Sequence, residues 1–261
     1  MNDFGSVNNL VKLNLHVDPK TLDDINVFHQ KSSYLLDKRF ARFGQFPISQ
    51  SALKQFEFSD NEISPFFHGA IKIVPQKKVN IRREYSQLFF NEKKMLFQDA
   101  ATLLSESFAA DENRKRPYPS GGALYPAEVI VVLMQERMIN SPDTGIYHYR
   151  TSMSLLQKLR STHINELYET ILFEPVEQMG SPCMCFIYVI NLQKAIVKYN
   201  YRGYRNAILE VGSMYQQADL VSQALGMKNR LSSSFSDLEV LKFLELDRNV
   251  YTPLVMQYFG Y

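Results

Sequence analysis

The sequence lacks the features that mark several large classes of protein. No run of apolar residues approaches the ~20 that a helix needs to cross a bilayer. The first residues have neither the basic start nor the apolar stretch of a secretory signal. Neither sign of charge dominates, since 29 basic residues face 27 acidic ones for a formal net charge of +2. These absences argue against a membrane protein and against a generally nucleic-acid-binding chain, and we expect a cytoplasmic protein.

Cysteine is also scarce. Only Cys183 and Cys185 occur, and the five histidines show no spacing typical of metal ligands. The alternation of residues 183–190 predicts a strand that carries both thiols on one face. We interpret the two cysteines as buried, reduced thiols and expect no metal site.

Core-forming residues, in contrast, are plentiful. The 261 residues are 45% hydrophobic and 21% charged, which is enough for one globular domain. Apolar periodicity predicts helices over about 20–37, 91–108 and 204–226, and strands over 129–133, 146–149, 183–191 and 254–259. The run 236–239, Ser-Asp-Leu-Glu, fits a capping box that opens another short helix.

The order of these elements predicts the fold and its division. Interleaved helices and strands predict an α+β fold with a central, mainly antiparallel sheet flanked by helices. The pattern is weak before residue 76. We therefore divide the chain into an N-terminal appendage, 1–75, as a possible docking region, and a domain, 76–261.

Three segments carry residue types suited to chemistry. The loop 116–126, Arg-Pro-Tyr-Pro-Ser-Gly-Gly-Ala-Leu-Tyr-Pro, is either a structural turn or a bare backbone that can approach a flat ring or a phosphate. The segment 198–205, Lys-Tyr-Asn-Tyr-Arg-Gly-Tyr-Arg, fits a packed helix entrance, a single-strand nucleic-acid patch or an acid/base pair. Arg82 and Arg83 suit a phosphate or are a surface pair. Spacing alone does not choose among these alternatives.

Taken together, these segments resemble the SagB/McbC-like thiazole/oxazole dehydrogenases of the nitroreductase superfamily. The resemblance rests on 116–126, 198–205, 210–216 and 225–230, covers about 76–261, and looks closest to the dehydrogenase subunit of a microcin-type azole synthetase. It implies a nitroreductase-like fold with FMN bound between the chains of an intertwined homodimer. It also implies cyclodehydratase subunits of an azole synthetase as partners, a leader-bearing precursor peptide as substrate, and dioxygen as electron acceptor.

The resemblance further implies roles for single residues. Lys198 and Tyr199 match the catalytic pair of the azoline dehydrogenases. The residues expected to bind the cofactor are Arg82, Arg83, Arg116, Pro119, Ser120, Gly121, Gly122, Tyr125, Ser233, Ser234 and Phe235. The sequence departs from the family at Glu84, which stands where serine usually follows the paired arginines.

The reaction implied is the oxidation of an azoline ring to an azole. Lys198 or Tyr199 takes a proton from one ring carbon while the neighbouring carbon gives a hydride to the flavin. Two other functions stay open. An FMN reductase of small molecules such as nitroarenes or quinones is the first, although Ala123 stands where many nitroreductases have a flavin-contacting asparagine. A flavin-fold subunit that only scaffolds a complex is the second, and the intact glycines and Lys-Tyr pair argue against it.

Overall fold

The computed structural model describes residues 16–32, 51, 83, 86–162, 166 and 179–261. The chain divides into two compact units, one of Met1–Leu35 with Arg82–Tyr261 and the other of Leu36–Ile81. The second unit lies almost entirely outside the described residues, so the fold below is that of the first. The boundary expected at residue 76 stays a prediction.

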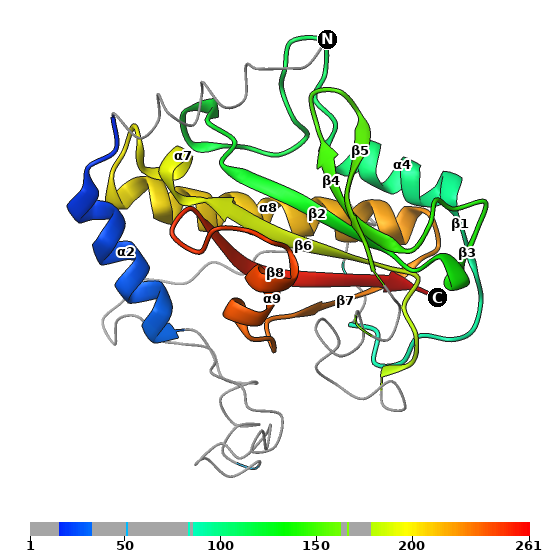
Figure 1. Ribbon diagram of the computed structural model, residues 1–261. Helices are drawn as coiled ribbons and strands as arrows, with labels where there is room; N and C mark the ends of the chain where they lie inside the picture. The colour runs from blue at the N-terminus through cyan, green and yellow to red at the C-terminus, as the bar shows by residue number, and fades with distance from the viewer. Residues whose placement is uncertain (1–15, 33–50, 52–82, 84–85, 163–165, 167–178) are drawn as a thin grey trace. The chain divides into compact units, whose positions relative to one another are not determined.

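A six-stranded sheet forms the centre of the first unit (Figure 1). Its strand order is β5-β4-β2-β6-β8-β7, and every pair of neighbours is antiparallel. The strands are β2 (Ala127–Leu133), β4 (Gly145–Arg150), β5 (Leu155–Ser161), β6 (Met184–Asn191), β7 (Lys228–Ser232) and β8 (Tyr251–Gly260). The four predicted strands are confirmed as β2, β4, β6 and β8. The two edge strands, β5 and β7, were not predicted.

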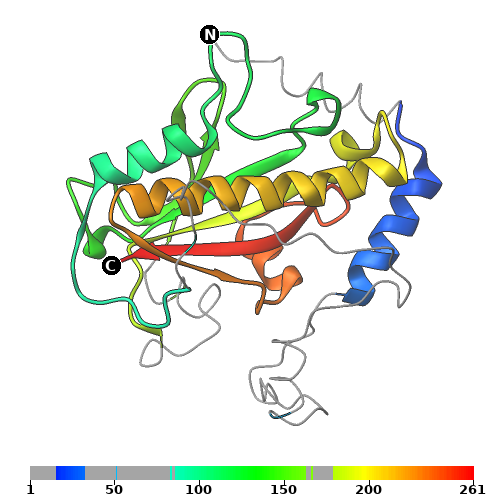
Figure 2. The ribbon, with the colours of Figure 1, turned by 180° about the vertical axis from the view of Figure 1, so that it is seen from behind.

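Helices cover both faces of this sheet. Figure 2 shows α4 (Phe97–Phe108) and α8 (Tyr201–Ala224) side by side on one face, and Figure 1 shows α9 (Asp237–Phe243) on the other. The remaining elements are α2 (Pro19–Ser32), β1 (Met95–Leu96), the 3₁₀ turns η1 (Gly121–Ala123) and η2 (Gln135–Arg137), β3 (Met138–Ile139) and α7 (Leu192–Ile196). None of the described helices is long and apolar enough to cross a membrane.

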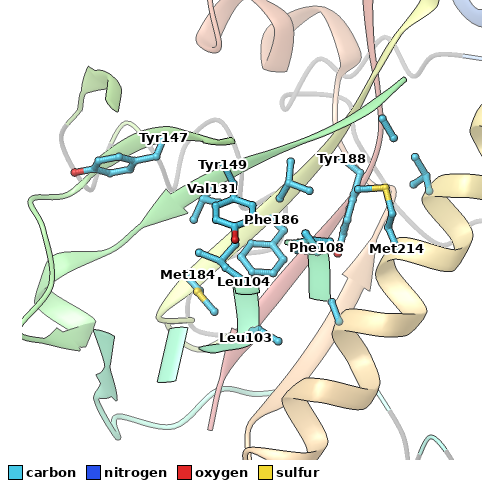
Figure 3. Packing of buried hydrophobic residues seen from close by; sticks show 14 of the residues in the cluster. Leu103, Leu104, Phe108, Val131, Tyr147, Tyr149, Met184, Phe186, Tyr188 and Met214 are labelled. Carbon is cyan, nitrogen blue, oxygen red and sulfur yellow. The ribbon is translucent and has the colours of Figure 1, made fainter. Parts of the chain in front are cut away.

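The core consists of two clusters, one on each face of the sheet. Alternate residues of β2 and β6 supply both clusters, as the two-residue period of a strand requires. Phe108 of α4, Phe186 and Tyr188 of β6, and Met214 of α8 meet on the face shown in Figure 3. The second cluster packs Ile187 and its neighbours against α9. Because β2, β6 and β8 are covered on both faces, they hold the loops at their ends rigidly.

Three local expectations were wrong in detail. The helix expected from residue 91 begins only at Phe97, because Met95–Leu96 pair with β3. Ser236 is the N-cap of α9, but its side chain makes no capping hydrogen bond. Cys183 and Cys185 are both free and buried as expected, but they belong to different clusters, because Cys183 precedes β6 and does not share its alternation.

Helix α2 is the described part of the N-terminal region. It corresponds to the helix predicted over 20–37, of which the residues beyond Ser32 lie outside the described ones. It packs on α7 and α8, where Ile25 enters the first core cluster. Tyr201 donates a hydrogen bond to Asp24. The N-terminal residues 19–32 therefore contact the same helices that carry the candidate site.

Candidate functional site

The glycine-containing loop between α4 and β2 has an unusual backbone. Gly122, Ala123 and Tyr125 all have left-handed φ values, of 68°, 55° and 48°. The two residues with a Cβ pay a steric cost for this conformation, and such strain is often found at functional sites. A hydrogen bond of 2.9 Å from the Tyr125 N–H to Ser120 Oγ closes the loop. Gly122 and Ala123 are exposed, so this side of the loop offers backbone atoms to a ligand.

The structure brings this loop against Lys198 and Tyr199, the pair expected to be catalytic. A Cβ placed on Gly122 would lie 2.7 Å from Tyr199 Oη and 3.2 Å from Lys198 Nζ. Only glycine fits there without displacing the pair. Two segments that the sequence singled out separately therefore form one site.

A tight turn between α7 and α8 presents Lys198 and Tyr199. Gly203 sits so close to α7 that a Cβ would lie 2.0 Å from the Ala195 carbonyl oxygen. Asn200, the residue before α8, also has a left-handed φ of 47°. Lys198 Nζ lies 5.1 Å from the centroid of the Tyr199 ring, and Tyr199 is 36% exposed. The two polar ends are thus close together and open to a substrate.

Arg116 lies at the other side of the same loop. Its guanidinium donates a hydrogen bond of 2.9 Å to Tyr118 Oη and stacks 4.4 Å from the centroid of the Tyr125 ring. Burial raises the pKa of the Tyr118 phenol, so this hydroxyl stays protonated and accepts from Arg116. Arg116 therefore stabilises the loop through Tyr118 and Tyr125. Pro119, which lies between these two tyrosines in the sequence, is exposed.

Glu210 is a member of this site that the sequence analysis quoted only as part of a motif. It lies on the buried face of α8, and 2% of it is exposed. Its Oε1 atom accepts from the Ala127 N–H at 3.4 Å, while Oε2 has no hydrogen-bond partner among the described residues. Burial raises the pKa of this carboxyl to about 7. The signal for it was an acid at a position of the helix where Ala207, Val211 and Met214 are apolar.

Arg83 lies far from these groups, at the other end of α8. Its Nε is 3.5 Å from Asp219 Oδ1, and its Nη2 donates 2.7 Å to Ser86. Asp219 is buried and also accepts 2.6 Å from Asn229. Arg82 lies outside the described residues. The structure therefore does not bring Arg83 together with the loop 116–126 within one chain.

The loop 233–235 connects β7 to α9. Ser234 donates its N–H to Ser232 Oγ at 3.2 Å, and Phe235 packs in the core cluster on the α9 face. Asp237, just after it, is 3.3 Å from His29 Nε2, and His29 Nδ1 is 3.0 Å from Tyr204 Oη in the first turn of α8. Ser233, Ser234 and Phe235 are thus linked to the start of α8 through α2, not to the glycine loop directly.

Comparison with known proteins identifies relatives over nearly the whole chain, although no protein-family model matches. The chain is 33% identical to the microcin B17-processing protein McbC of Escherichia coli over 256 residues, which are 96% of this chain and 94% of the relative. It is 25% identical to the trifolitoxin-processing protein TfxB of Rhizobium leguminosarum bv. trifolii over 75% of this chain and 50% of the relative.

Solved structures give the same result. A chain of the E. coli microcin synthetase McbBCD complex with truncated pro-MccB17 bound matches with a TM-score of 0.89 at 33% identity, over 97% of both chains. A putative nitroreductase from Ralstonia eutropha JMP134 matches with a TM-score of 0.57 at 14% identity, over 72% of this chain and 86% of that one. The expected α+β, nitroreductase-like fold is confirmed.

Proposed function

The chain belongs to the family of the microcin B17-processing protein McbC, and from this premise we propose that it is the FMN-dependent dehydrogenase subunit of an azole synthetase. It oxidises thiazoline or oxazoline rings to thiazole or oxazole in a ribosomally made precursor peptide. The observation that carries the proposal is the packing of Gly122 against Tyr199 and Lys198. This packing places the exposed backbone of the glycine loop, which can support a flat cofactor, beside two groups that can transfer protons.

The acid/base work falls to Lys198 and Tyr199. An azoline becomes an azole when two adjacent ring carbons lose one hydrogen each. The hydrogen on the carbon between the ring nitrogen and the peptide carbonyl is the acidic one, and Tyr199 Oη or Lys198 Nζ accepts it as a proton. Bound FMN supplies the acceptor for the hydride from the other carbon, with dioxygen as the final oxidant. The glycine loop would hold the flavin ring in a fixed position relative to Lys198 and Tyr199.

The residues present fit a flavin. Pro119, Gly122 and Ala123 are exposed, and Gly122 lies against the pair, so a planar ring can rest on the loop. A side chain at Gly122 would occupy the space beside Tyr199. Ser233, Ser234 and Arg83 are the further groups we assign to the cofactor, with Arg83 toward its phosphate.

We propose a homodimer because Arg83 and the pair Lys198 and Tyr199 lie toward opposite ends of α8. Arg83 contacts Asp219, whereas Lys198 and Tyr199 precede Tyr201, and at ~1.5 Å per residue these ends of α8 are roughly 25 Å apart. One FMN does not reach both in one chain, so each site takes its halves from two copies. The exposed face of α8 suits the contact, because Leu209 is 71% exposed. A Cβ on Gly212 would meet nothing closer than 3.9 Å within this chain.

The dimer proposal has a direct test. Leu209→Asp is expected to weaken the dimer and FMN binding together, while Met153→Asp, at a position 60% exposed elsewhere, changes neither. Light scattering gives the mass and absorbance gives the flavin content. A flavin-loaded monomer would contradict the shared site.

Partners are the remaining part of the proposal. We expect a complex with cyclodehydratase subunits, supported by the likeness to a chain of a synthetase complex with a precursor peptide bound. Azolines hydrolyse and azoles do not, so proximity to the cyclodehydratase raises the effective concentration of a labile substrate. Residues 1–75 stay our candidate for the docking region.

Co-purification with tagged cyclodehydratase tests the docking assignment. Removal of residues 1–75 would also remove α2 from α8, so the sharper variant replaces only the unit Leu36–Ile81 with a flexible linker. We expect this variant to keep its flavin and lose association. If it still associates, the complex stands and docking does not lie within Leu36–Ile81, which leaves only residues 1–35 of the candidate region.

Substrate specificity separates this function from a general FMN reductase. The purified complex is expected to convert a thiazoline peptide to the thiazole in air, and to reduce a nitroarene with a nicotinamide cofactor much more slowly. Mass spectrometry follows the peptide, and absorbance follows the nitroarene. Fast nitroreduction without any azole would favour the reductase instead.

A further inference from the structure

A single buried carboxyl lies beneath the turn that carries the two glycines. Glu210 Oε1 accepts from the Ala127 N–H, at the end of the turn where β2 begins. Ser120, at the start of the turn, lies close enough for its hydroxyl to stabilise the ionised carboxyl. Ser120 Oγ in turn accepts from the Tyr125 N–H at 2.9 Å. Both ends of the turn 120–127 therefore rest on one side chain of α8.

Glu210 also reaches the catalytic side of the site. With Gly121 and Tyr199 it lines a narrow gap between the turn and the α7–α8 junction. Its Oε2 atom is buried there and has no hydrogen-bond partner among the described residues. A buried polar atom left unpaired is costly, and an apolar residue would avoid that cost. The acid is thus expensive for folding, and it lines the same gap as Tyr199.

We propose that Glu210 is a positioning residue that holds the turn 120–127 so that Gly121 and Gly122 keep their place against Tyr199. The effect of this role on flavin binding rests on the proposed function, because the turn is the surface assigned to FMN. Glu210 does not touch the reacting atoms. It acts through the turn, so flavin binding depends on its two acceptor contacts.

The charge of Glu210 is poised to change near neutral pH. Burial raises its pKa to about 7, against the opposing effects of Ser120, the Ala127 N–H, Arg116 and Lys194. The other titratable groups that face it are Tyr118 and Tyr199. Protonation removes the negative charge that strengthens both acceptor contacts. The turn is therefore held less firmly below pH ~7.

Glu210→Gln and Glu210→Ala separate the effect of the negative charge from the effect of the acceptor contacts. The amide of Gln keeps an acceptor oxygen for the Ala127 N–H and cannot ionise, whereas Ala loses both contacts. Val211→Ala is the matched control, because it removes a buried side chain from the next position of α8 but no hydrogen-bond acceptor. Each variant is made in the complete chain, and its FMN dissociation constant is measured between about pH 6 and pH 8.

We expect Glu210→Ala to weaken FMN binding by about tenfold or more, and Glu210→Gln by less than about threefold. The wild-type affinity falls as the pH drops through the pKa of Glu210, and the affinity of Glu210→Gln stays level. Val211→Ala binds FMN like the wild type. If Glu210→Ala binds FMN normally, or if Glu210→Gln is as weak as Glu210→Ala, the proposal is overturned.

A second readout does not depend on flavin. Hydrogen exchange of the Tyr125 and Ala127 amides is expected to speed up about tenfold or more in Glu210→Ala, and to stay unchanged in Val211→Ala. If the wild type binds no FMN, the proposed function fails, and this exchange still decides whether Glu210 holds the turn. Unchanged exchange in Glu210→Ala would overturn the positioning role by itself.

Discussion

The two ends of helix α8 are built in opposite ways. At its C-terminal half, Asp219 pairs with Asn229, Asn229 with Gln257, and Gln257 with Tyr188, through bonds of 2.6, 3.1 and 2.6 Å. At its N-terminal half, one oxygen of Glu210 has no hydrogen-bond partner in the part of the chain that the structure describes. The residue before α8, Asn200, and two non-glycine residues of the facing loop adopt left-handed φ values.

This difference separates scaffold from site. A buried network whose members are hydrogen-bonded to one another stabilises one arrangement of α8, β7 and β8 and offers no group for proton transfer. Strained backbone and an unpaired acid destabilise the fold, and they persist where the surrounding packing holds them. The glycine loop, Lys198 and Tyr199 gather at the strained end. If this is right, substitutions at the N-terminal end of α8 affect mainly the chemistry, and substitutions at its C-terminal end affect mainly the stability.

The largest effect is expected from Lys198 and Tyr199, the pair proposed to be catalytic. Tyr199→Phe and Lys198→Ala should each slow azole formation by about 10²–10⁴-fold, the contribution of a general acid or base. Both residues are exposed, so flavin content and melting temperature should barely change. Rates are measured by mass spectrometry on an azoline peptide. Loss of the flavin in either variant would assign the residue to cofactor binding instead.

Glu210 provides the next test, through the pH dependence of stability. Folding raises its pKa from 4.5 to about 7, so the folded state holds a proton that the unfolded state releases. The resulting stability is fully present below the unfolded value and is lost as the pH rises through the folded value. Relative to Glu210→Gln, the wild type should lose up to about 3 kcal/mol of unfolding free energy across this range.

Denaturant unfolding of both proteins at a series of pH values measures that difference. A difference that stays level from acid to neutral pH would mean that Glu210 ionises freely in the folded protein. The N-terminal half of α8 would then be as well paired as the C-terminal half, which would contradict the difference between the two ends of the helix.

Gly122→Ala tests the contact between the loop and the pair. The new Cβ would lie 2.7 Å from Tyr199 Oη, and the residue has a φ of 68°. We expect a loss of azole formation of about tenfold or more, together with the ~1–2 kcal/mol cost of the left-handed backbone. Gly226→Ala is the matched control, because Gly226 has a φ of 69° and nothing within 4 Å of its Cβ position. Equal loss of activity in both variants would show that backbone strain, not the contact, matters.

The smallest effect is expected at the paired end. Tyr188→Phe removes the donor to Gln257 Oε1 from a fully buried position, at a cost of about 1–2 kcal/mol. The rate of azole formation per folded molecule should not change. A rate that falls by more than about threefold, which means a barrier raised by more than about 0.6 kcal/mol, would tie the scaffold to the chemistry.

The sequence predicted the covered strands and missed the edges for a physical reason. β2 and β6 are nearly continuous apolar runs, interrupted only by Glu128 and by the final Asn191, because both of their faces are buried. β5 and β7 lie at the edges, and their sequences, Leu-Leu-Gln-Lys-Leu-Arg-Ser and Lys-Asn-Arg-Leu-Ser, carry little apolar periodicity. Local pattern therefore identifies a strand only where burial constrains it.

The site was predictable in its parts and not in its assembly. The motifs around Gly122 and Lys198 could each be found in the sequence. Only the tertiary structure brings the loop before β2 into contact with the turn between α7 and α8. Glu210 was visible as an acid in an amphipathic helix. Its burial depends on Ala127 and Ser120, which are distant in sequence, so no local pattern reveals its raised pKa.

The central claim is that this chain removes hydrogen from an azoline and passes it to FMN with Lys198 or Tyr199 as the base. The most direct measurement mixes flavin-loaded protein with one equivalent of a thiazoline peptide in the absence of dioxygen. We predict that the visible flavin absorbance is lost and that the peptide becomes lighter by two hydrogens, in equal amounts, with Tyr199→Phe far slower. An unchanged peptide beside a fully oxidised flavin would contradict the account.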